Sequence, residues 1–211
     1  MTQTAQDKID RISRGSVDKF AERRDQLAES ALLTLSELGY ARTSLREIAQ
    51  NSDFSHGVLH YYFRDKVDLI THCVRRYKAV CVQRYDEIVA TAQTAEELRE
   101  GFAAGLAQTL VEDATMHRLW YDLRAQSLFE ESFRPDVHDI DQSLERMIWR
   151  IVSRYAELSG TTPYLTSAPT YALLDGLFQQ SLLTQLSGQA DSAKRLRAHV
   201  RPVMGRLIHD Q

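Results

Sequence analysis

The chain has 211 residues, of which 43% are hydrophobic, and this is enough for one large domain or for two compact units with separate cores. Its formal net charge of −3 excludes the uniformly basic character of a protein that coats nucleic acid. Residues 1–66 carry ten basic and ten acidic side chains, so any contact with DNA must be made by a local surface.

The sequence has no features of a secreted or membrane protein. No apolar segment precedes a cleavage site near the N-terminus, and no run of about 18 apolar residues occurs. Cys73 and Cys81 are separated by about 12 Å of rise on one predicted helix, so they cannot form a disulfide with each other. We expect both thiols to be buried and reduced in a cytoplasmic protein.

The N-terminal segment contains two different patterns. Residues 1–18 are polar and basic with little apolar periodicity, which predicts a mobile arm or a short frayed helix, or alternatively an arm that reaches a DNA minor groove. Apolar residues then recur at helical spacing from Leu27 to Leu38 and stop at Gly39, a residue typical of helix C-caps. The second pattern predicts a helix with one buried face.

A short helix is predicted to follow. Ser44 and Glu47 have the spacing of a capping box, which starts a helix that ends near Gln50. Residues 51–53 have turn chemistry, and Asp53 belongs to the few residue types that tolerate a left-handed backbone.

A further short helix is predicted from Ser55 to about Tyr62. Two helices of this length are unstable alone, and together with their longer neighbours they indicate a helix-turn-helix, whose second helix enters a DNA major groove. The segment between Ser55 and Arg64 contains no carboxylate, as a surface facing phosphates requires. The predicted outward residues are Ser55, His56, Gly57, His60 and Tyr61, and the predicted inward residues are Ile48, Ala49, Phe54, Leu59 and Phe63.

The rest of the chain also shows helical periodicity without strand alternation. The fold class predicted is all-α with about nine helices, in which residues 1–66 form an arm and a DNA-binding domain and residues 67–211 form a larger helical domain. We expect a six-turn helix from about 66 to 90, a break near Pro135 and a loop at 159–163. The other predicted helices span about 94–110, 116–129, 140–158, 169–186 and 191–208.

Large side chains with an apolar body and a polar handle gather between residues 117 and 133. Such side chains suit a pocket that is apolar and also orients a ligand, although each of them could instead fill a core. The residues predicted to form an effector pocket are His117, Trp120, Tyr121, Arg124, Phe129, Trp149 and Phe178.

The helix predicted at 169–186 is apolar on two faces and therefore needs two partners. The helix at 140–158 is its expected neighbour in a four-helix interface between two copies of the chain. A two-fold homodimer would place two recognition helices about one DNA turn apart, matching a palindromic operator. The residues predicted for the dimer interface are Leu144, Ile148, Ile151, Leu174, Phe178 and Leu182.

Residues 43–69 resemble the DNA-binding signature of the TetR (tetracycline repressor) family in the runs Thr43–Ala49 and Ser55–Phe63 and in Lys66 and Leu69. The resemblance implies a transcriptional repressor that a small-molecule effector releases from its operator, or alternatively a ligand-dependent activator. In the predicted dimer, an effector that moves the helix from Lys66 to about Ala90 like a lever would change the separation of the two recognition helices, so that both could no longer fit the DNA groove.

The resemblance further implies a set of residues that contact double-stranded DNA. Phosphate contacts are expected at the start of the first short helix and at the end of the second, and base contacts at the start of the second. Two departures stand out: Asp53 replaces the usual glycine of the turn, and His60 replaces the usual tyrosine. The implied DNA-binding residues are Thr43, Ser44, Arg46, Ser55, His56, Gly57, Val58, His60, Tyr61, Tyr62 and Lys66.

Other functions have weaker support. His56 and His60 have the i, i+4 spacing of metal ligands, but no third ligand follows in a suitable order, so we expect no metal. A helical enzyme using His117, Tyr121 and Arg124 lacks any pairing of a nucleophile with a base, and we expect neither catalysis nor a cofactor. A module that binds a protein groove is disfavoured by the absence of carboxylates from the recognition face.

Overall fold

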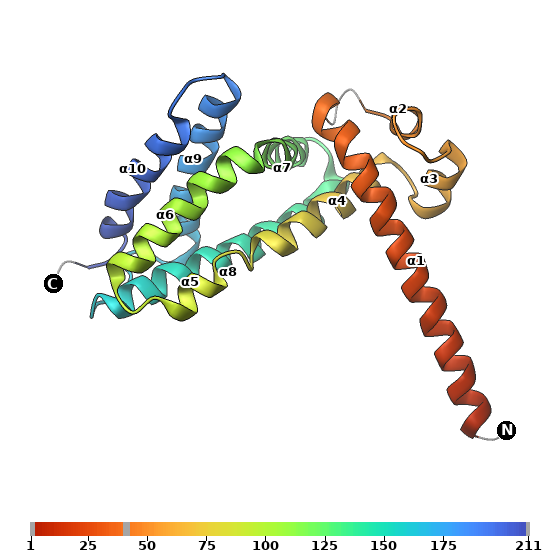
Figure 1. Cartoon of the computed structure of the whole chain (residues 1–211), viewed down its shortest axis with the longest axis horizontal. Helices are drawn as coiled ribbons and strands as arrows, with labels where there is room; N and C mark the ends of the chain where they lie inside the picture. Colours follow the sequence, from red (N-terminus) through yellow and green to blue (C-terminus); the bar gives the residue numbers. More distant parts are fainter. Residues whose placement is uncertain (1–2, 40–42, 210–211) are drawn as a thin grey trace. The chain divides into compact units, whose positions relative to one another are not determined.

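The structure, a computed structural model, describes residues 3–39 and 43–209 (Figure 1). In these ranges the secondary structure is helical, and the single β interaction is an isolated bridge between Pro163 and Ile208. The predicted all-α fold is confirmed. The chain divides into two compact units, Met1–Val74 and Arg75–Gln211.

Helix α1 (Gln3–Leu38) is longer than the sequence pattern indicated. The prediction of an arm or a short frayed helix at 1–18 is wrong, because one helix continues from Gln3. The segment 3–26 has a single glycine and no proline and is rich in good helix formers, which extend a helix even without apolar periodicity. The predicted end is confirmed: Gly39 has φ 75°, and its N–H donates to the carbonyl of Leu35 at 2.8 Å.

Both predicted caps of the helix-turn-helix are present. Before α2 (Leu45–Gln50), the Glu47 N–H donates to Ser44 Oγ at 3.2 Å, and the Ser44 N–H donates to Glu47 Oε2 at 2.7 Å. Before α3 (His56–Tyr62), the Val58 N–H donates to Ser55 Oγ at 3.3 Å.

The turn between these helices differs from expectation. Asp53 is not left-handed, since the one non-glycine residue with positive φ in the described ranges is Asp191 at 64°. The turn is instead made by hydrogen bonds: the Ser52 N–H donates to the carbonyl of Ala49, and Ser52 Oγ accepts from the Phe54 N–H at 3.3 Å.

The core of the first unit forms where α1, α2 and α3 pack together, and the start of α4 (Lys66–Cys81) joins them, with Cys73 Sγ donating to the carbonyl of Ala28 at 3.3 Å. The start of α4 is capped by Asp65, whose Oδ1 accepts from the Asp68 N–H at 2.8 Å. The fully buried side chains of this core include Leu27, Ala31, Leu35, Ile48, Leu59, Phe63, Leu69, Ile70 and Cys73.

The six-turn helix predicted at 66–90 is interrupted. Helix α4 ends at Cys81, and a turn leads to the short α5 (Asp86–Thr91). The turn brings Tyr85 into the core, where its ring lies 5.2 Å from that of Phe102 in an edge-on contact. A Cβ on Gly105 would lie 2.8 Å from the Tyr85 ring, so only glycine leaves room for this inward turn.

The second unit is completed by α6 (Ala95–Glu112), α7 (Ala114–Gln126), α8 (Arg134–Leu158), α9 (Ser167–Leu186) and α10 (Ser192–Arg206). Helix α10 packs against α6 and α9, and α8 packs against α9 (Figure 1). No helix in the described part of the chain is long and apolar enough to span a membrane.

The break predicted near Pro135 lies earlier in the chain. It spans residues 127–133, including a 3₁₀ turn at Glu131–Phe133, and Pro135 lies in the first turn of α8. Proline is tolerated there because the first N–H groups of a helix have no partner within the helix.

Candidate DNA interface and ligand cavity

The outer face of α3 is polar, and the opposite face packs on the core of the first unit. Tyr61 is 74% exposed, whereas Leu59 and Phe63 are fully buried in the core of the first unit. The predicted division into outward and inward residues is confirmed, except that Ala49 and Phe54 are only half-buried. The exposed residues are Ser55, His56, Gly57, His60 and Tyr61.

Helix α1 supports the aromatic end of α3. The Phe20 ring lies 4.7 Å from the ring of Tyr62, and the Tyr62 ring lies 5.0 Å from that of Tyr61, almost perpendicular to it. The Arg23 guanidinium lies 4.8 Å from the centre of the Phe54 ring. The ring contacts orient Tyr61 and Tyr62 at the end of α3, and the Arg23 contact holds Phe54 just before its start.

His56 and His60 act as a pair on this face. Their Nε2 atoms are 3.1 Å apart, and their rings meet edge-on with centroids separated by 4.4 Å. One nitrogen must donate and the other accept, so the two side chains hold each other in place. No third metal-ligating side chain joins them in the described part of the chain.

The other residues implied to contact DNA differ in their exposure to solvent. Arg46 and Ser44 are exposed, whereas Val58 and Lys66 are half-buried. Thr43 is only 3% exposed, and its hydroxyl donates to the carbonyl of Gly39 at 2.6 Å. The Thr43 hydroxyl is therefore bound within the protein and is not exposed for the implied contact with a phosphate.

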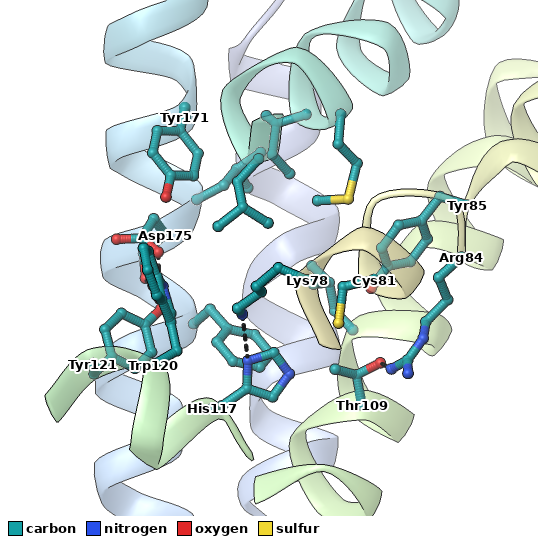
Figure 2. Close-up of a pocket in the computed structure, with 16 residues that line it drawn as sticks. Lys78, Cys81, Arg84, Tyr85, Thr109, His117, Trp120, Tyr121, Tyr171 and Asp175 are labelled. Atoms are coloured by element: carbon teal, nitrogen blue, oxygen red, sulfur yellow. Dashed lines mark hydrogen bonds between the residues drawn. The ribbon is translucent and has the colours of Figure 1, made fainter. Parts of the chain in front are cut away.

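A cavity of about 70 Å³ lies inside the second unit (Figure 2). Its lining comes from the end of α4, the following turn, α6, α7, α8 and α9. Figure 2 shows Lys78 in the middle, reaching toward His117. On one side lie Trp120, Tyr121, Tyr171 and Asp175, and on the other lie Cys81, Arg84, Tyr85 and Thr109.

The predicted pocket residues fall into two groups, those that line the cavity and those that do not. Four of the seven line it: His117, Trp120, Tyr121 and Phe178.

The other three predicted pocket residues do not line the cavity. Phe129 is 84% exposed because the chain turns outward after α7. Trp149 is half-buried beside the inward-facing Ile148, and Arg124 contacts the lining residues Asp175, by an ion pair, and Tyr171, by its ring. The density of aromatic residues in the sequence identified α7 as part of the pocket, but it could not show which rings face the cavity and which face solvent.

The residues predicted for the dimer interface face the interior of their own unit. All six are buried within the chain, because both helices place their most apolar stripe against the core of their own unit. Leu144, Ile148, Leu174 and Phe178 line the cavity, and Ile151 and Leu182 are at most 3% exposed.

A polar network forms one wall of the cavity. Asp175 accepts hydrogen bonds from the Tyr121 hydroxyl at 2.8 Å and from Arg124 at 2.5 Å. Arg124 also pairs with Asp141 at 3.2 Å, and the Tyr171 hydroxyl donates to Asp141 at 2.5 Å. Burial and the nearby Asp175 carboxylate raise the pKa of both tyrosines, which therefore remain protonated donors.

Lys78 is the most unusual residue of the cavity because it is charged and only 3% exposed. Its Nζ lies 3.2 Å from His117 Nδ1, and the Tyr77 hydroxyl lies 3.1 Å from His117 Nε2. Burial lowers the pKa of Lys78 to about 8, and burial together with the charges of Lys78 and Arg84 lowers the pKa of His117 to about 2. At neutral pH the ammonium therefore donates to a neutral imidazole, whose Nε2–H faces Tyr77.

The prediction from sequence missed Lys78, Cys81, Tyr85 and Asp175 as lining residues. One signal was available for Lys78. It lies four residues after Val74 on the apolar stripe of α4, at a position where a surface lysine would not be expected.

A helix-turn-helix followed in the same chain by a helical unit with an internal cavity is the architecture of a DNA-binding transcriptional regulator. The family model for bacterial regulatory proteins of the tetR family matches residues 27–73. The regulator BetI of Paraburkholderia phymatum is 28% identical over 82% of this chain and 88% of its own length. The repressor KstR2 of Mycobacterium tuberculosis is 28% identical over 63% of this chain and 78% of its own.

A solved regulator from Saccharomonospora viridis, in complex with choline, has the same fold. It superposes with a TM-score of 0.73 at 18% identity and covers 90% of this chain and all of its own. The chain is therefore a DNA-binding transcriptional regulator that is similar to members of the TetR family, and its match to the family model lies in the DNA-binding segment.

Proposed function

We propose that the protein is a homodimeric repressor that binds a palindromic operator and releases it when a small-molecule effector occupies the cavity. The observation that carries this proposal is the exposed face of α3, which offers hydroxyl, imidazole and backbone groups and no carboxylate between Ser55 and Arg64. Repression rather than activation is supported by KstR2, which is named a repressor.

The proposed contacts divide by the chemistry of each side chain. Ser44, Tyr62 and Lys66 bind phosphate or sugar and position the unit, while Arg46 reaches the backbone or a base edge. The start of α3, with its small Gly57, lets the helix approach the bases closely. The remaining proposed DNA contacts are Ser55, His56, Val58, His60 and Tyr61.

The effector is proposed to bind in the cavity and to act through α4. The choline complex of the Saccharomonospora viridis regulator supports ligand binding in a protein of this fold. Helix α4 begins at Lys66 and carries Lys78, so it contributes to both the proposed DNA surface and the cavity. An effector releases the operator only if it binds the conformation that cannot bind DNA more tightly than the one that can.

The homodimer is proposed to form through the outer faces of α8 and α9. Leu173 and Leu183 on α9 are 44% and 55% exposed, and a Cβ added at Gly176 between them would meet no other atom. A flat apolar strip of this kind allows two helices to approach closely. We expect Leu183→Glu to give a monomer in sedimentation experiments and to weaken operator binding, while the matched Val111→Glu leaves the dimer intact.

DNA binding is tested by the salt dependence of affinity, measured by fluorescence anisotropy on a duplex selected by the protein. Affinity should fall steeply with salt, and Arg46→Ala should reduce the slope of log K against log salt by about 1. A matched control is Arg195→Ala, which removes an exposed arginine from α10. Affinity that does not depend on salt, or equal slopes for the two variants, would contradict the proposed contact.

A further inference from the structure

The cavity contains one positive charge that has no acidic partner. Arg84 is paired with Asp113 at 2.7 Å, and Asp175 is paired with Arg124 at 2.5 Å. Lys78 takes part in no ion pair within the described part of the chain, and its only side-chain hydrogen-bond partner there is His117. A buried ammonium normally has a carboxylate or several acceptors around it.

The unsatisfied hydrogen-bonding groups of the cavity are donors. Lys78 has three N–H groups and gives one to His117 Nδ1. Trp120, whose ring centre lies 5.4 Å from Lys78 Nζ, has a buried Nε1–H without a partner in the described part of the chain. A ligand that completes this site must therefore supply acceptor oxygens.

We propose that the cavity binds an organic monocarboxylate, with its carboxylate on Lys78 and its apolar body among the aromatic and aliphatic side chains of the lining. The inference builds on the proposed function because it gives the chemical class of the effector. Aromatic and aliphatic groups such as Trp120, Phe178 and Leu174 provide the apolar surface, and Lys78 provides the charge that orients the ligand.

A cationic ligand fits this site less well. Aromatic cavities hold quaternary ammonium groups through cation–π contacts, and the structurally similar Saccharomonospora viridis regulator binds choline. Here, however, the Lys78 ammonium already occupies that role, 5.4 Å from the centres of both the Trp120 and Tyr77 rings. The Asp175 carboxylate accepts from Tyr121 and Arg124 and is not free to bind a cation.

The size of the cavity limits the ligand to a compact acid. A volume of 70 Å³ is enough for roughly five water molecules, at about 10–15 Å³ for each. Benzoate and phenylacetate are therefore suitable probes, because each combines one carboxylate with a small apolar body. Benzamide and phenylacetamide have nearly the same shape and no charge.

The first experiment measures binding of these four probes and of choline to the full-length protein by isothermal titration calorimetry. We expect at least one carboxylate to bind at least tenfold more tightly than its amide and than choline. Lys78→Met and Lys78→Gln should each remove that difference, while Lys194→Met, on the exposed surface of α10, should preserve it. Circular dichroism of each variant verifies that it is folded.

The second experiment follows carboxylate affinity against pH. Lys78 is faced by Tyr77, Cys81 and Arg84 from its own helix and turn, and by His117 of α7, Asp141 of α8 and Asp175 of α9. Since the Lys78 pKa is about 8 in the free protein, affinity should fall about tenfold between pH 7 and pH 9 as the ammonium loses its proton. The same profile should be flat in Lys78→Met, which separates Lys78 from its titratable neighbours.

The outcomes distinguish this inference from the proposed function. Tighter binding of an amide or of choline, an unchanged carboxylate affinity in both Lys78 variants, or no binding of any acid to the wild-type protein would each overturn the inference. Operator binding is measured separately with the same variants. A protein that binds the acids through Lys78 but binds no DNA would contradict the proposed function and leave the ligand assignment standing.

Discussion

The two units of this protein build their functional surfaces in opposite ways. The proposed DNA interface comes from one contiguous segment, residues 44–66, and its exposed polar groups point outward from a small core. The cavity draws its lining from segments between Lys78 and Phe178, and its polar groups are turned inward and buried. A surface made from a local segment depends on helix caps and spacing, whereas an internal site depends on how distant helices pack.

This difference also has an energetic side. The exposed residues of α3 remain solvated, so their polar groups cost the fold little before DNA binds. Lys78 and the network around Asp175 are removed from water, so each must be compensated by a partner or reduce stability. Substitutions of exposed residues on α3 should therefore change DNA binding with little change in stability, whereas substitutions of the buried polar residues of the cavity should change stability as well.

The largest effect is expected for a core residue of the DNA-binding unit. Phe63 is fully buried beneath α3, so Phe63→Ala should lower the free energy of unfolding by about 3–5 kcal/mol, measured by urea denaturation. Tyr61→Ala, two residues away and 74% exposed, should change stability by no more than about 0.5 kcal/mol yet still weaken DNA binding. Equal losses of stability would contradict the division into a core and a reading face.

A smaller effect is expected for the network in the cavity wall. Asp175→Ala leaves the Tyr121 hydroxyl with only the more distant backbone carbonyl of residue 175, at 3.4 Å, and removes one of the two carboxylates of Arg124, which should cost about 3 kcal/mol of stability. The control, Asp139→Ala, breaks an exposed ion pair with Arg75 and should cost less than about 1 kcal/mol. Thermal melting of both variants shows whether the buried carboxylate carries the larger share.

The next effect has the opposite sign. Burial lowers the pKa of Lys78 to about 8, so below pH 8 the folded protein holds an ammonium that the unfolded chain would solvate better. Lys78→Met should therefore raise the free energy of unfolding by about 2 kcal/mol at pH 7. The gain should shrink as pH rises from 8 toward the ordinary lysine pKa, because the wild-type folded protein then loses this charge.

Urea denaturation at pH 7 and at pH 9.5 checks both the sign and the trend. A Lys78→Met variant that is less stable than the wild type at pH 7 would show that the ammonium has a stabilising partner after all. Such a result would assign Lys78 a role in stabilising the fold, and it would remove the contrast between a solvated and a buried functional surface.

The same contrast explains which predictions from sequence succeeded. The caps at Ser44 and Ser55 and the inward placement of Leu59 follow from local spacing, and the structure has them as predicted. The end of α4 at Cys81 could not be predicted, because it depends on the space that Gly105 leaves for Tyr85 across a distance of twenty residues.

The cavity was predicted only in part for a related reason. Aromatic density marked α7, and His117 and Trp120 line the cavity, but Phe129 lies beyond the helix end on the surface. Amphipathic periodicity shows that a helix has an apolar face without showing whether that face meets its own unit or a second chain. For that reason Leu174 was assigned to a dimer and Phe178 to both a dimer and a pocket, although both line the cavity.

The central claim is that the exposed face of α3 reads operator DNA, and selection from a library of random duplexes tests it most directly. The wild-type protein should enrich a palindrome whose half-sites are at least one turn apart, roughly 10 base pairs, at a salt concentration of about 50 mM. A His56→Ala, Tyr61→Ala double variant, altered only at exposed positions, should fold normally and enrich no sequence. If the wild-type protein retains no duplex under these conditions, or if the double variant enriches the same palindrome, the account is contradicted.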